Sequence, residues 1–284
     1  MIKIIKYFFQ SIIIYFFFLI IFVLRLNISR IIFSKLFALL GPFVKSKNII
    51  DKNLNIFSKN LSKNKKAAIK KMMWKNYGMT FVEYMFLNYF RKQNSHISIK
   101  GKENLLNLVN EKPVIFISGH FANFELMSME ITKLNIKLAT IYRPLNNIFL
   151  NLFMEYLRKK YICRNQIKKG INGVREAIGY IKRNYSVALM IDQRVSEGEK
   201  IKFFGKEALT TTLPSQLSTK YNLNIIPVFI KRIGINKFEM EFLKPINPNS
   251  FTSKIELSKK LNHVLENMIE KNPNQWIWSH NRWK

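Results

Sequence analysis

The chain opens with a long apolar segment. Residues Tyr7 to Leu24 are interrupted only by Gln10 and Ser11, and this length is close to the roughly 20 residues that cross a hydrocarbon core as a helix. No small-residue cleavage pattern follows it, and a second apolar stretch runs on to Val44. The pattern predicts a membrane anchor helix over residues 1–30, with a cleaved signal peptide as the alternative.

A basic region follows the anchor. Between Lys45 and Lys75 there are ten lysines and one acid, Asp51. This composition fits a basic face beside an anionic leaflet, and it fits ordinary exposed helices equally well. Met79 to Phe90 is then nearly all apolar, with Glu83 as its one charge, and belongs either to the core or to a membrane-facing surface. We expect residues 31–95 to form a basic, amphipathic helical region next to the membrane.

From about residue 96 short β-branched runs alternate with helical stretches. This alternation predicts strands connected by crossover helices. The expected strands are 96–100, 113–118, 137–142, 186–191, 200–204, 225–231 and 237–242. The expected helices are 104–110, 123–134, 147–160, 173–183, 213–221 and 253–271. Residues 96–284 should therefore form an α/β domain with a mixed central sheet flanked by helices.

Composition narrows the possible partners. A chain of 284 residues suits a single catalytic domain with appendages. Its formal net charge of +30 should attract phosphates, anionic lipid surfaces or acidic proteins, although part of it reflects a general bias toward Lys, Asn and Ile. One cysteine, Cys163, excludes an intramolecular disulfide and a thiol-metal cluster. Cys163 also has no histidine at a recognisable local spacing, which argues against a nucleophilic role.

One histidine stands where α/β sheets place their ligands. The predicted strand 113–118 ends at Gly119 and delivers His120 at its carboxyl edge. A neutral imidazole is suited to taking a proton from a hydroxyl near pH 7. Glu125 follows beyond the local bend, and its carboxylate could return to the imidazole and fix its tautomer. Taken alone, such a pair more often marks a structural histidine than a catalytic one.

Five short motifs then occur in a set order. They are Gly119-His-Phe-Ala-Asn-Phe-Glu125, Tyr142-Arg-Pro144, Asp192-Gln193, Phe203-Phe-Gly205 and Gln275-Trp-Ile-Trp-Ser-His-Asn-Arg-Trp283. In this order they resemble the bacterial lipid A biosynthesis (lauroyl/myristoyl) acyltransferase family, part of the lysophospholipid acyltransferase superfamily. The resemblance covers about residues 110 to 284, and the apolar amino-terminal helix also fits the family. It implies a glycerolipid acyltransferase-like fold and an O-acyltransferase.

The resemblance also implies the site residues. The family's His-x4-Asp/Glu motif falls on His120 and Glu125, which makes them the expected catalytic pair. Expected substrate-binding residues are Arg143, Arg158 and Asp192, with the arginines suited to phosphate or carboxylate groups. For Arg143 the alternative role is a salt bridge at the end of a strand. For Arg158 the alternatives are Lys159 and Arg164, which would take its place if the alignment to the family shifted.

The implied reaction moves an acyl chain from acyl-acyl carrier protein, or alternatively acyl-CoA, to a hydroxyl of a Kdo2-lipid IVA type precursor in lipopolysaccharide biosynthesis. Backbone amides near residues 119–122, together with a nearby cation, are expected to stabilise the oxyanion. No cofactor, metal or nucleic acid is expected. The protein should be a monomer at the bacterial inner membrane, single-pass or monotopic, with its catalytic domain in the cytoplasm.

Some alternatives remain open at this stage. Another acceptor, either lysophosphatidate or a glycosylated phosphoinositide, would use the same scaffold. A remote alternative is a non-catalytic protein that binds anionic lipid or nucleic acid through its charge. The tryptophans Trp276, Trp278 and Trp283 either line an acyl-binding or interfacial surface or cap the core. His280 is expected to be a surface histidine bonded to backbone, with a second group of the site as the alternative.

Overall fold

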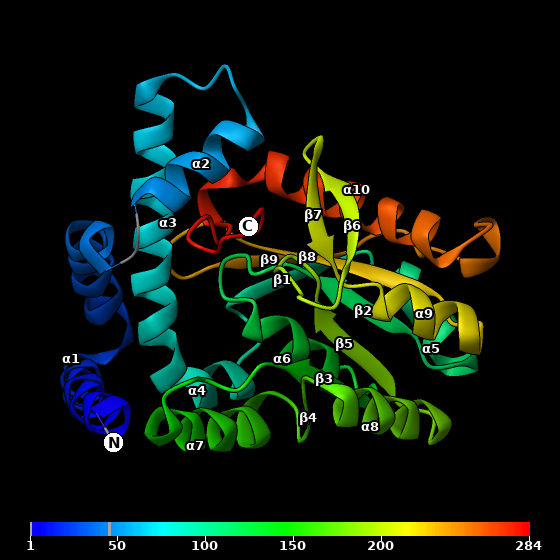
Figure 1. Ribbon diagram of the computed structural model, residues 1–284. Helices are drawn as coiled ribbons and strands as arrows, with labels where there is room; N and C mark the ends of the chain where they lie inside the picture. The colour runs from blue at the N-terminus through cyan, green and yellow to red at the C-terminus, as the bar shows by residue number, and fades with distance from the viewer. Residues whose placement is uncertain (1, 45–46) are drawn as a thin grey trace.

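The computed structural model describes residues 2–44 and 47–284, and a seven-stranded sheet forms its centre (Figure 1). The strands follow the order β1-β9-β8-β2-β5-β3-β4. Their bounds are β1 (Ile97–Lys100), β2 (Ile115–Ser118), β3 (Leu138–Tyr142), β4 (Asn165–Lys168), β5 (Ser186–Met190), β8 (Ile225–Arg232) and β9 (Phe238–Phe242). Neighbours are parallel except β8 and β9, which are antiparallel. The mixed α/β sheet predicted from the sequence is confirmed.

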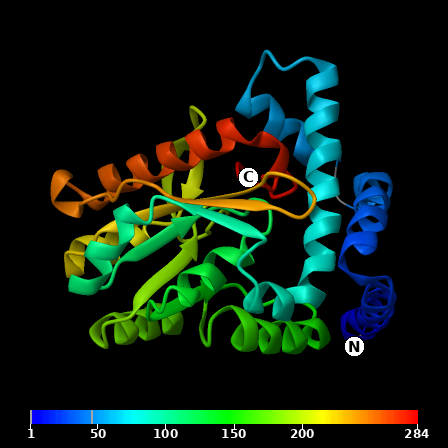
Figure 2. The ribbon, with the colours of Figure 1, turned by 180° about the vertical axis from the view of Figure 1, so that it is seen from behind.

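Helices cover both faces of this sheet. Helices α6, α7 and α8 lie on one side and α10 on the other, as the two opposite views show (Figures 1 and 2). The helices are α1 (Ile2–Val44), α2 (Lys47–Phe57), α3 (Lys63–Glu83), α4 (Leu87–Lys92), α5 (Glu103–Glu111), α6 (Glu125–Lys133), α7 (Ile148–Leu157), α8 (Ile171–Lys182), α9 (Leu213–Tyr221) and α10 (Lys254–Lys271). A wider turn, Arg158–Ile162, continues α7, and single turns form at Tyr84–Phe86, Pro248–Ser250 and Pro273–Gln275.

Two strands were not predicted. They are β4, at the edge of the main sheet, and β7 (Lys206–Thr210), which pairs antiparallel with β6 (Glu199–Phe203) in a separate hairpin. Both are rich in polar residues, because one side of each faces solvent, so neither shows the apolar run typical of a buried strand. The hairpin stands above the sheet beside α10 (Figure 1).

The predicted apolar helix is present at the amino terminus. Among the described residues one helix, Ile2–Phe43, is long and apolar enough by length and composition to cross a membrane. It is not a straight rod, because Arg25 interrupts it with φ 60° and ψ 171°, values outside the helical region. Much of its surface is exposed and apolar, and it lies beside α3 at one end of the molecule (Figure 1).

Helices α2 to α4 share the core of the sheet domain. Leu54, Trp74 and Phe90 are buried in the same apolar cluster as Phe116 of β2. For residues 79–90, the core and a membrane-facing surface were the two alternatives. This segment contributes to the core, since Phe90 and the charged Glu83 are both fully buried. The basic stretch that was expected to begin at residue 45 starts outside the described residues.

Candidate active site

Three adjacent parallel strands deliver predicted site residues to one edge of the sheet. β2, β5 and β3 are neighbours, and their carboxyl ends lead into His120, Asp192 and Arg143. Because parallel strands end at the same edge, residues that are 72 positions apart in sequence come into contact there. The site therefore lies at the place where open α/β sheets hold ligands.

A cavity of about 550 Å³ opens at this edge. Four of the five predicted site residues line it, namely His120, Glu125, Arg143 and Arg158. Its volume falls within the roughly 300–1,000 Å³ typical of small-molecule sites. Asp192 is not part of the wall, because it lies behind His120 and has no exposed surface. Asp192, predicted to bind substrate, therefore does not reach the cavity in this structure and contacts His120 instead.

His120 and Asp192 form a hydrogen-bonded pair. The Nδ1 atom of the imidazole lies 2.7 Å from Oδ1 of Asp192, and the backbone N–H of His120 donates to Oδ2 at 2.7 Å. Burial alone would raise the pKa of Asp192, but its electrostatic interaction with His120 and these hydrogen bonds outweigh burial and hold the pKa below its usual value. A carboxylate only accepts, so Nδ1 carries the proton and Nε2 of the neutral ring is left able to take one.

The carboxyl-terminal motif supports this pair from behind. The indole Nε1 of Trp276 donates to Oδ2 of Asp192 at 2.9 Å. Trp276 and Trp278 are fully buried and Trp283 is nearly so, and all three belong to the main core cluster. Of the two alternatives for these tryptophans, the structure shows the core position, with Trp276 adding a polar contact to the site.

Gly119 allows the strand end to come this close. A Cβ atom at Gly119 would lie 2.8 Å from Cε2 of Phe121, 2.9 Å from Cδ1 of Leu265 and 3.3 Å from Oδ2 of Asp192. The first two distances are too short for carbon atoms that do not bond to each other. A side chain here would push the histidine loop away from the carboxylate.

Glu125 has a different partner from the predicted one. Its Oε1 accepts hydrogen bonds from Nε of Arg158 at 2.8 Å, from Nη2 of Arg158 at 2.5 Å and from the hydroxyl of Tyr84 at 2.8 Å. Burial, together with the charge of Glu125, raises the pKa of Tyr84, which keeps its hydroxyl protonated as a donor. The predicted hydrogen bond to the imidazole is not formed between these two described residues, because Asp192 takes Nδ1 and Glu125 starts a helix that turns it toward Arg158.

Arg158 lines the cavity and has one donor without a partner among the described residues. This donor is its buried Nη1. Burial disfavours the charged form, but the pairing with Glu125 outweighs it and the pKa of Arg158 is raised, so the group stays cationic. Its sequence neighbours Lys159 and Arg164 are exposed and do not line the cavity. The structure thus places Arg158, and not the two competing residues, at the site.

A second cation joins Arg143 at the cavity mouth. Lys169 also lines the cavity, and partial burial followed by the nearby charge of Arg143 lowers its pKa. Lys169 was not predicted as a site residue, because nothing in the sequence distinguishes it from Lys168, which directly precedes it. Two like charges held near each other favour an anionic group between them.

The amino-acid sequence matches a known family across its length. Residues 2–284 fit the sequence profile described as "Bacterial lipid A biosynthesis acyltransferase". The chain belongs to this family. The protein is therefore an acyltransferase, and the resemblance inferred from the five motifs is confirmed.

Two relatives found by sequence agree with this assignment. The chain is 24% identical over 262 residues to the lipid A biosynthesis palmitoleoyltransferase of Escherichia coli (strain K12). This alignment covers 88% of this chain and 83% of the relative. It has the same identity and coverage with the lipid A biosynthesis acyltransferase of Shigella flexneri. Among solved structures, the 1-acyl-sn-glycerophosphate acyltransferase PlsC from Thermotoga maritima aligns with a TM-score of 0.44 and 17% identity, over 87% of this chain and 99% of that one.

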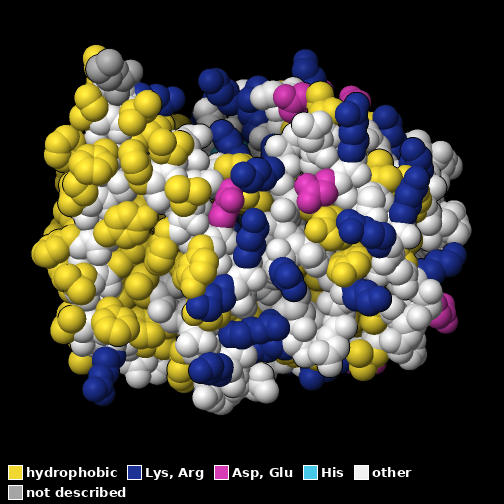
Figure 3. Space-filling view, turned by 90° about the horizontal axis from the view of Figure 1, so that it is seen from below, with side chains coloured by type: hydrophobic (Ala, Val, Ile, Leu, Met, Phe, Trp, Pro, Cys, Tyr) yellow, Lys and Arg dark blue, Asp and Glu magenta, His cyan; other side chains and the backbone are white. Residues whose placement is uncertain are grey.

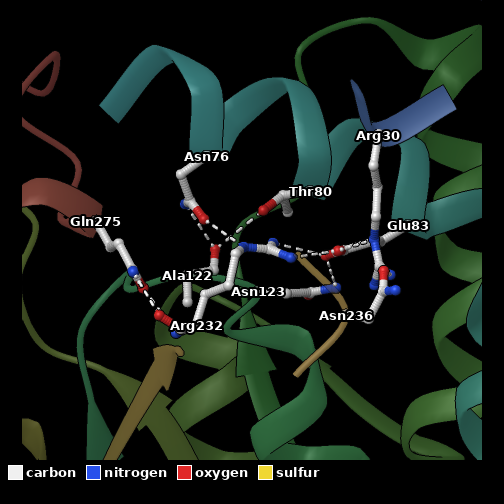
Figure 4. A network of polar contacts seen from close by, with 9 residues as sticks. All are labelled: Arg30, Asn76, Thr80, Glu83, Ala122, Asn123, Arg232, Asn236 and Gln275. Carbon is white, nitrogen blue, oxygen red and sulfur yellow. Dashed lines mark hydrogen bonds and ion pairs between the residues drawn. The ribbon is translucent and has the colours of Figure 1, made fainter. Parts of the chain in front are cut away.

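Helix α3 holds the histidine loop of this acyltransferase (Figure 4). The loop carries a left-handed residue, Ala122, with φ 46°. The carbonyl of Ala122 accepts from Nδ2 of Asn76 and from the hydroxyl of Thr80, both at 3.1 Å, and its N–H donates to the carbonyl of Gln275 at 3.2 Å. Helix α3 thus holds the loop through the carbonyl of Ala122, and the carboxyl-terminal motif holds it through the N–H of the same residue.

A buried ion cluster continues this support (Figure 4). Glu83 accepts from Nη1 of Arg232 at 2.6 Å, from Nε of Arg30 at 2.8 Å and from Nδ2 of Asn123 at 2.9 Å. Burial would raise the pKa of Glu83, but its two arginine partners more than compensate and lower it. Sequence reasoning missed this role, and the signal was a single acid in an otherwise apolar segment. The cluster connects α1, through Arg30, to the loop that carries His120.

The other candidate groups take no part in this geometry. The Nε2 atom of His280 accepts from the backbone N–H of Arg194 at 2.9 Å, and burial lowers the pKa of His280 to about 4, which keeps it neutral. Cys163 is buried, burial raises the pKa of its thiol, and its Sγ donates to a backbone carbonyl. Within residues 2–44 and 47–284 no group of three or more His, Cys, Asp or Glu side chains is arranged to hold a metal ion.

Proposed function

We propose that this acyltransferase moves a fatty acyl chain from acyl-acyl carrier protein to a hydroxyl of a Kdo2-lipid IVA type lipid A precursor, with His120 as the general base. One observation carries the proposal: the imidazole stands on the wall of the cavity, and the buried Asp192 holds its Nδ1. That arrangement leaves Nε2 as the proton acceptor. Ser128 also lines the cavity, but among the described residues no serine or cysteine side chain is hydrogen-bonded to the imidazole, which favours direct attack by the substrate hydroxyl.

The reaction then follows from the positions of these groups. Nε2 of His120 takes the proton of the acceptor hydroxyl as its oxygen attacks the thioester carbonyl. The tetrahedral intermediate collapses, the carbon–sulfur bond breaks, and the imidazolium returns the proton to the departing thiolate. Asp192 stabilises the imidazolium between these two transfers, as a buried carboxylate does in serine hydrolases.

Of the donors first expected for the oxyanion, the nearby cation fits better than the backbone amides. The backbone N–H groups of His120, Phe121 and Ala122 already donate to Asp192, to the carbonyl of Gly119 and to the carbonyl of Gln275. We therefore assign charge stabilisation to Arg158, whose buried Nη1 has no partner among the described residues. Glu125 remains in the catalytic group in this proposal, because it orients the guanidinium through two hydrogen bonds.

The basic character of the chain supports the proposed substrates. A carrier protein that is strongly acidic would be steered toward a surface with this net charge of +30, and acyl-CoA is the alternative donor. Arg143 and Lys169 at the cavity mouth suit the phosphate or carboxylate groups of the acceptor headgroup. We place the domain on the cytoplasmic side of the inner membrane, where such a carrier is found.

Product analysis tests the substrates. The purified protein in detergent would be given Kdo2-lipid IVA or lysophosphatidate, each with a panel of acyl-acyl carrier proteins and acyl-CoAs, and the products weighed by mass spectrometry. We expect one added acyl group on Kdo2-lipid IVA with carrier-protein donors. Acylation of lysophosphatidate alone would contradict the proposed acceptor, and transfer from acyl-CoA alone would contradict the proposed donor.

A further inference from the structure

Helix α7 presents an apolar face to the outside. Leu152 is 72% exposed, and Ile148 and Tyr156 are each 53% exposed. The polar side chains of this helix are occupied within the protein, because Oε1 of Glu155 accepts from Tyr142 at 2.5 Å and from Asn151 at 2.8 Å. A short helix whose Asn and Glu side chains both turn inward has an outer surface suited to an apolar environment.

This face is continuous with the amino-terminal helix. The hydroxyl of Tyr15 donates to the carbonyl of Phe149 at 2.9 Å, and Nδ2 of Asn147 donates to the carbonyl of Tyr7 at 2.8 Å. The rings of Phe8 and Phe149 also pack edge to face, 5.6 Å apart. Residues 7–18 of α1 therefore lie along α7. If this part of α1 enters a bilayer, α7 must be at the bilayer as well.

Basic side chains border the apolar face. From Arg143 to Arg183 the chain has ten Lys and Arg residues and two Glu, and all the basic ones except Arg158 are exposed. Figure 3 shows apolar side chains gathered on the side where α1 and α7 lie, with Lys and Arg next to them. An apolar surface with a basic margin matches a leaflet that has a hydrocarbon interior and anionic headgroups.

The cavity opens at the same margin. The loop between β3 and α7 supplies Arg143, Leu145 and Asn146 to the cavity wall, and Leu145 is 40% exposed. The same loop ends at Asn147, which caps α7 and contacts α1. The mouth of the site is thus part of the surface formed by α1 and α7.

We propose that α7 and the loop before it lie in the headgroup region of an anionic leaflet, side by side with α1, so that the cavity mouth meets the membrane surface. The acceptor then reaches His120 with its acyl chains still in the leaflet. This last step rests on the proposed function, whereas the membrane contact of α7 does not.

Depth-dependent quenching tests the contact itself. The full-length protein, with Cys163→Ser to remove the native thiol, would carry an environment-sensitive fluorophore at Leu152→Cys and be reconstituted into vesicles of phosphatidylethanolamine and phosphatidylglycerol. A matched label at Lys206→Cys, at the start of β7 next to the β6–β7 turn, on the far side of the molecule (Figure 1), is the control. We expect lipid-borne nitroxide to quench the label at 152 and not the label at 206. Equal quenching of both labels by aqueous iodide would overturn the proposal. The apolar face of α7 would then have to be covered by a protein partner instead of lipid.

An activity ratio tests the consequence for catalysis. Leu152→Glu would be compared with Leu106→Glu, which introduces the same charge at an exposed leucine of α5. We expect the ratio of activity on vesicle-embedded acceptor to activity on detergent-dispersed acceptor to fall about tenfold for Leu152→Glu, because burying one leucine in an apolar phase is worth about that factor or more. An equal ratio for both variants would contradict the proposal. If the wild type acylates nothing in either medium, the proposed function fails while the quenching result still decides the membrane contact.

Discussion

Replacing Asp192 by asparagine tests the pairing that the structure assigns to His120. The amide has the shape of the carboxylate but carries an NH2 group, which cannot accept a hydrogen bond. To keep a bond with that group, the imidazole must offer the lone pair of Nδ1 and move its proton to Nε2. The nitrogen that has to receive the substrate proton would then already be protonated.

The expected loss is large because Asp192 has no exposed surface and three donors converge on it. Water cannot take over its role, and the imidazolium formed during the reaction loses its buried counter-charge. The same substitution in a Ser-His-Asp hydrolase costs about 10⁴-fold in kcat. We expect a loss of about 10³- to 10⁴-fold in kcat with little change in KM, because Asp192 does not line the cavity.

Two assays check this prediction. Steady-state acyl transfer gives kcat and KM, and nitrogen-15 NMR of labelled histidine gives the tautomer of the His120 ring. Glu125→Gln is the matched control, because it removes a buried carboxylate of the same site that bonds to Arg158 instead of the imidazole. We expect the tautomer to change only in Asp192→Asn. If Asp192→Asn keeps a tenth of the wild-type kcat, or if Glu125→Gln alone alters the tautomer, the pairing described here is refuted.

Three further outcomes follow from the buried groups around the site. Glu83→Gln should destabilise the protein by about 3–5 kcal/mol, because it leaves two buried arginines without their shared partner; a midpoint of thermal unfolding equal to the wild type would contradict this. Gly119→Ala should cost about 1–3 kcal/mol of stability and also lower kcat, since its Cβ would contact Phe121 at 2.8 Å. The folded-state pKa of Asp192 and of Glu83 lies below the unfolded value. The stability that these groups contribute is therefore present above about pH 4 and is lost as the pH falls further. When the free energy of unfolding is measured against pH, Asp192→Asn should show a smaller decrease at acid pH than the wild type.

Most elements of the fold could be predicted from the hydrophobic pattern. The buried strands β2, β5 and β8 have the continuous apolar runs that parallel sheets require, and the helix expected at 213–221 has those bounds in the structure. The pattern failed for β4 and β7, where an edge position or a hairpin exposes one side and permits polar residues. Local pattern does not show which strands will be neighbours at an edge.

The site shows the same division between local and distant information. Sequence reasoning found His120 and Glu125 through a motif within one segment. It could not pair His120 with Asp192, because that contact depends on β2 and β5 being adjacent in the sheet. The ion cluster of Glu83 joins α1, α3 and β8, elements whose packing no local spacing predicts. A lone acid within an apolar segment was the only sign of it.

Single-turnover acyl transfer by the wild-type protein and by His120→Ala tests the central claim most directly. The reaction would contain Kdo2-lipid IVA and an acyl-acyl carrier protein that supports the wild type, with unchanged thermal unfolding as the check that the variant is folded. Loss of a general base predicts a rate lower by about 10²- to 10⁴-fold at the same level of acceptor binding. A folded His120→Ala variant that transfers the acyl chain within a few-fold of the wild-type rate would contradict the account.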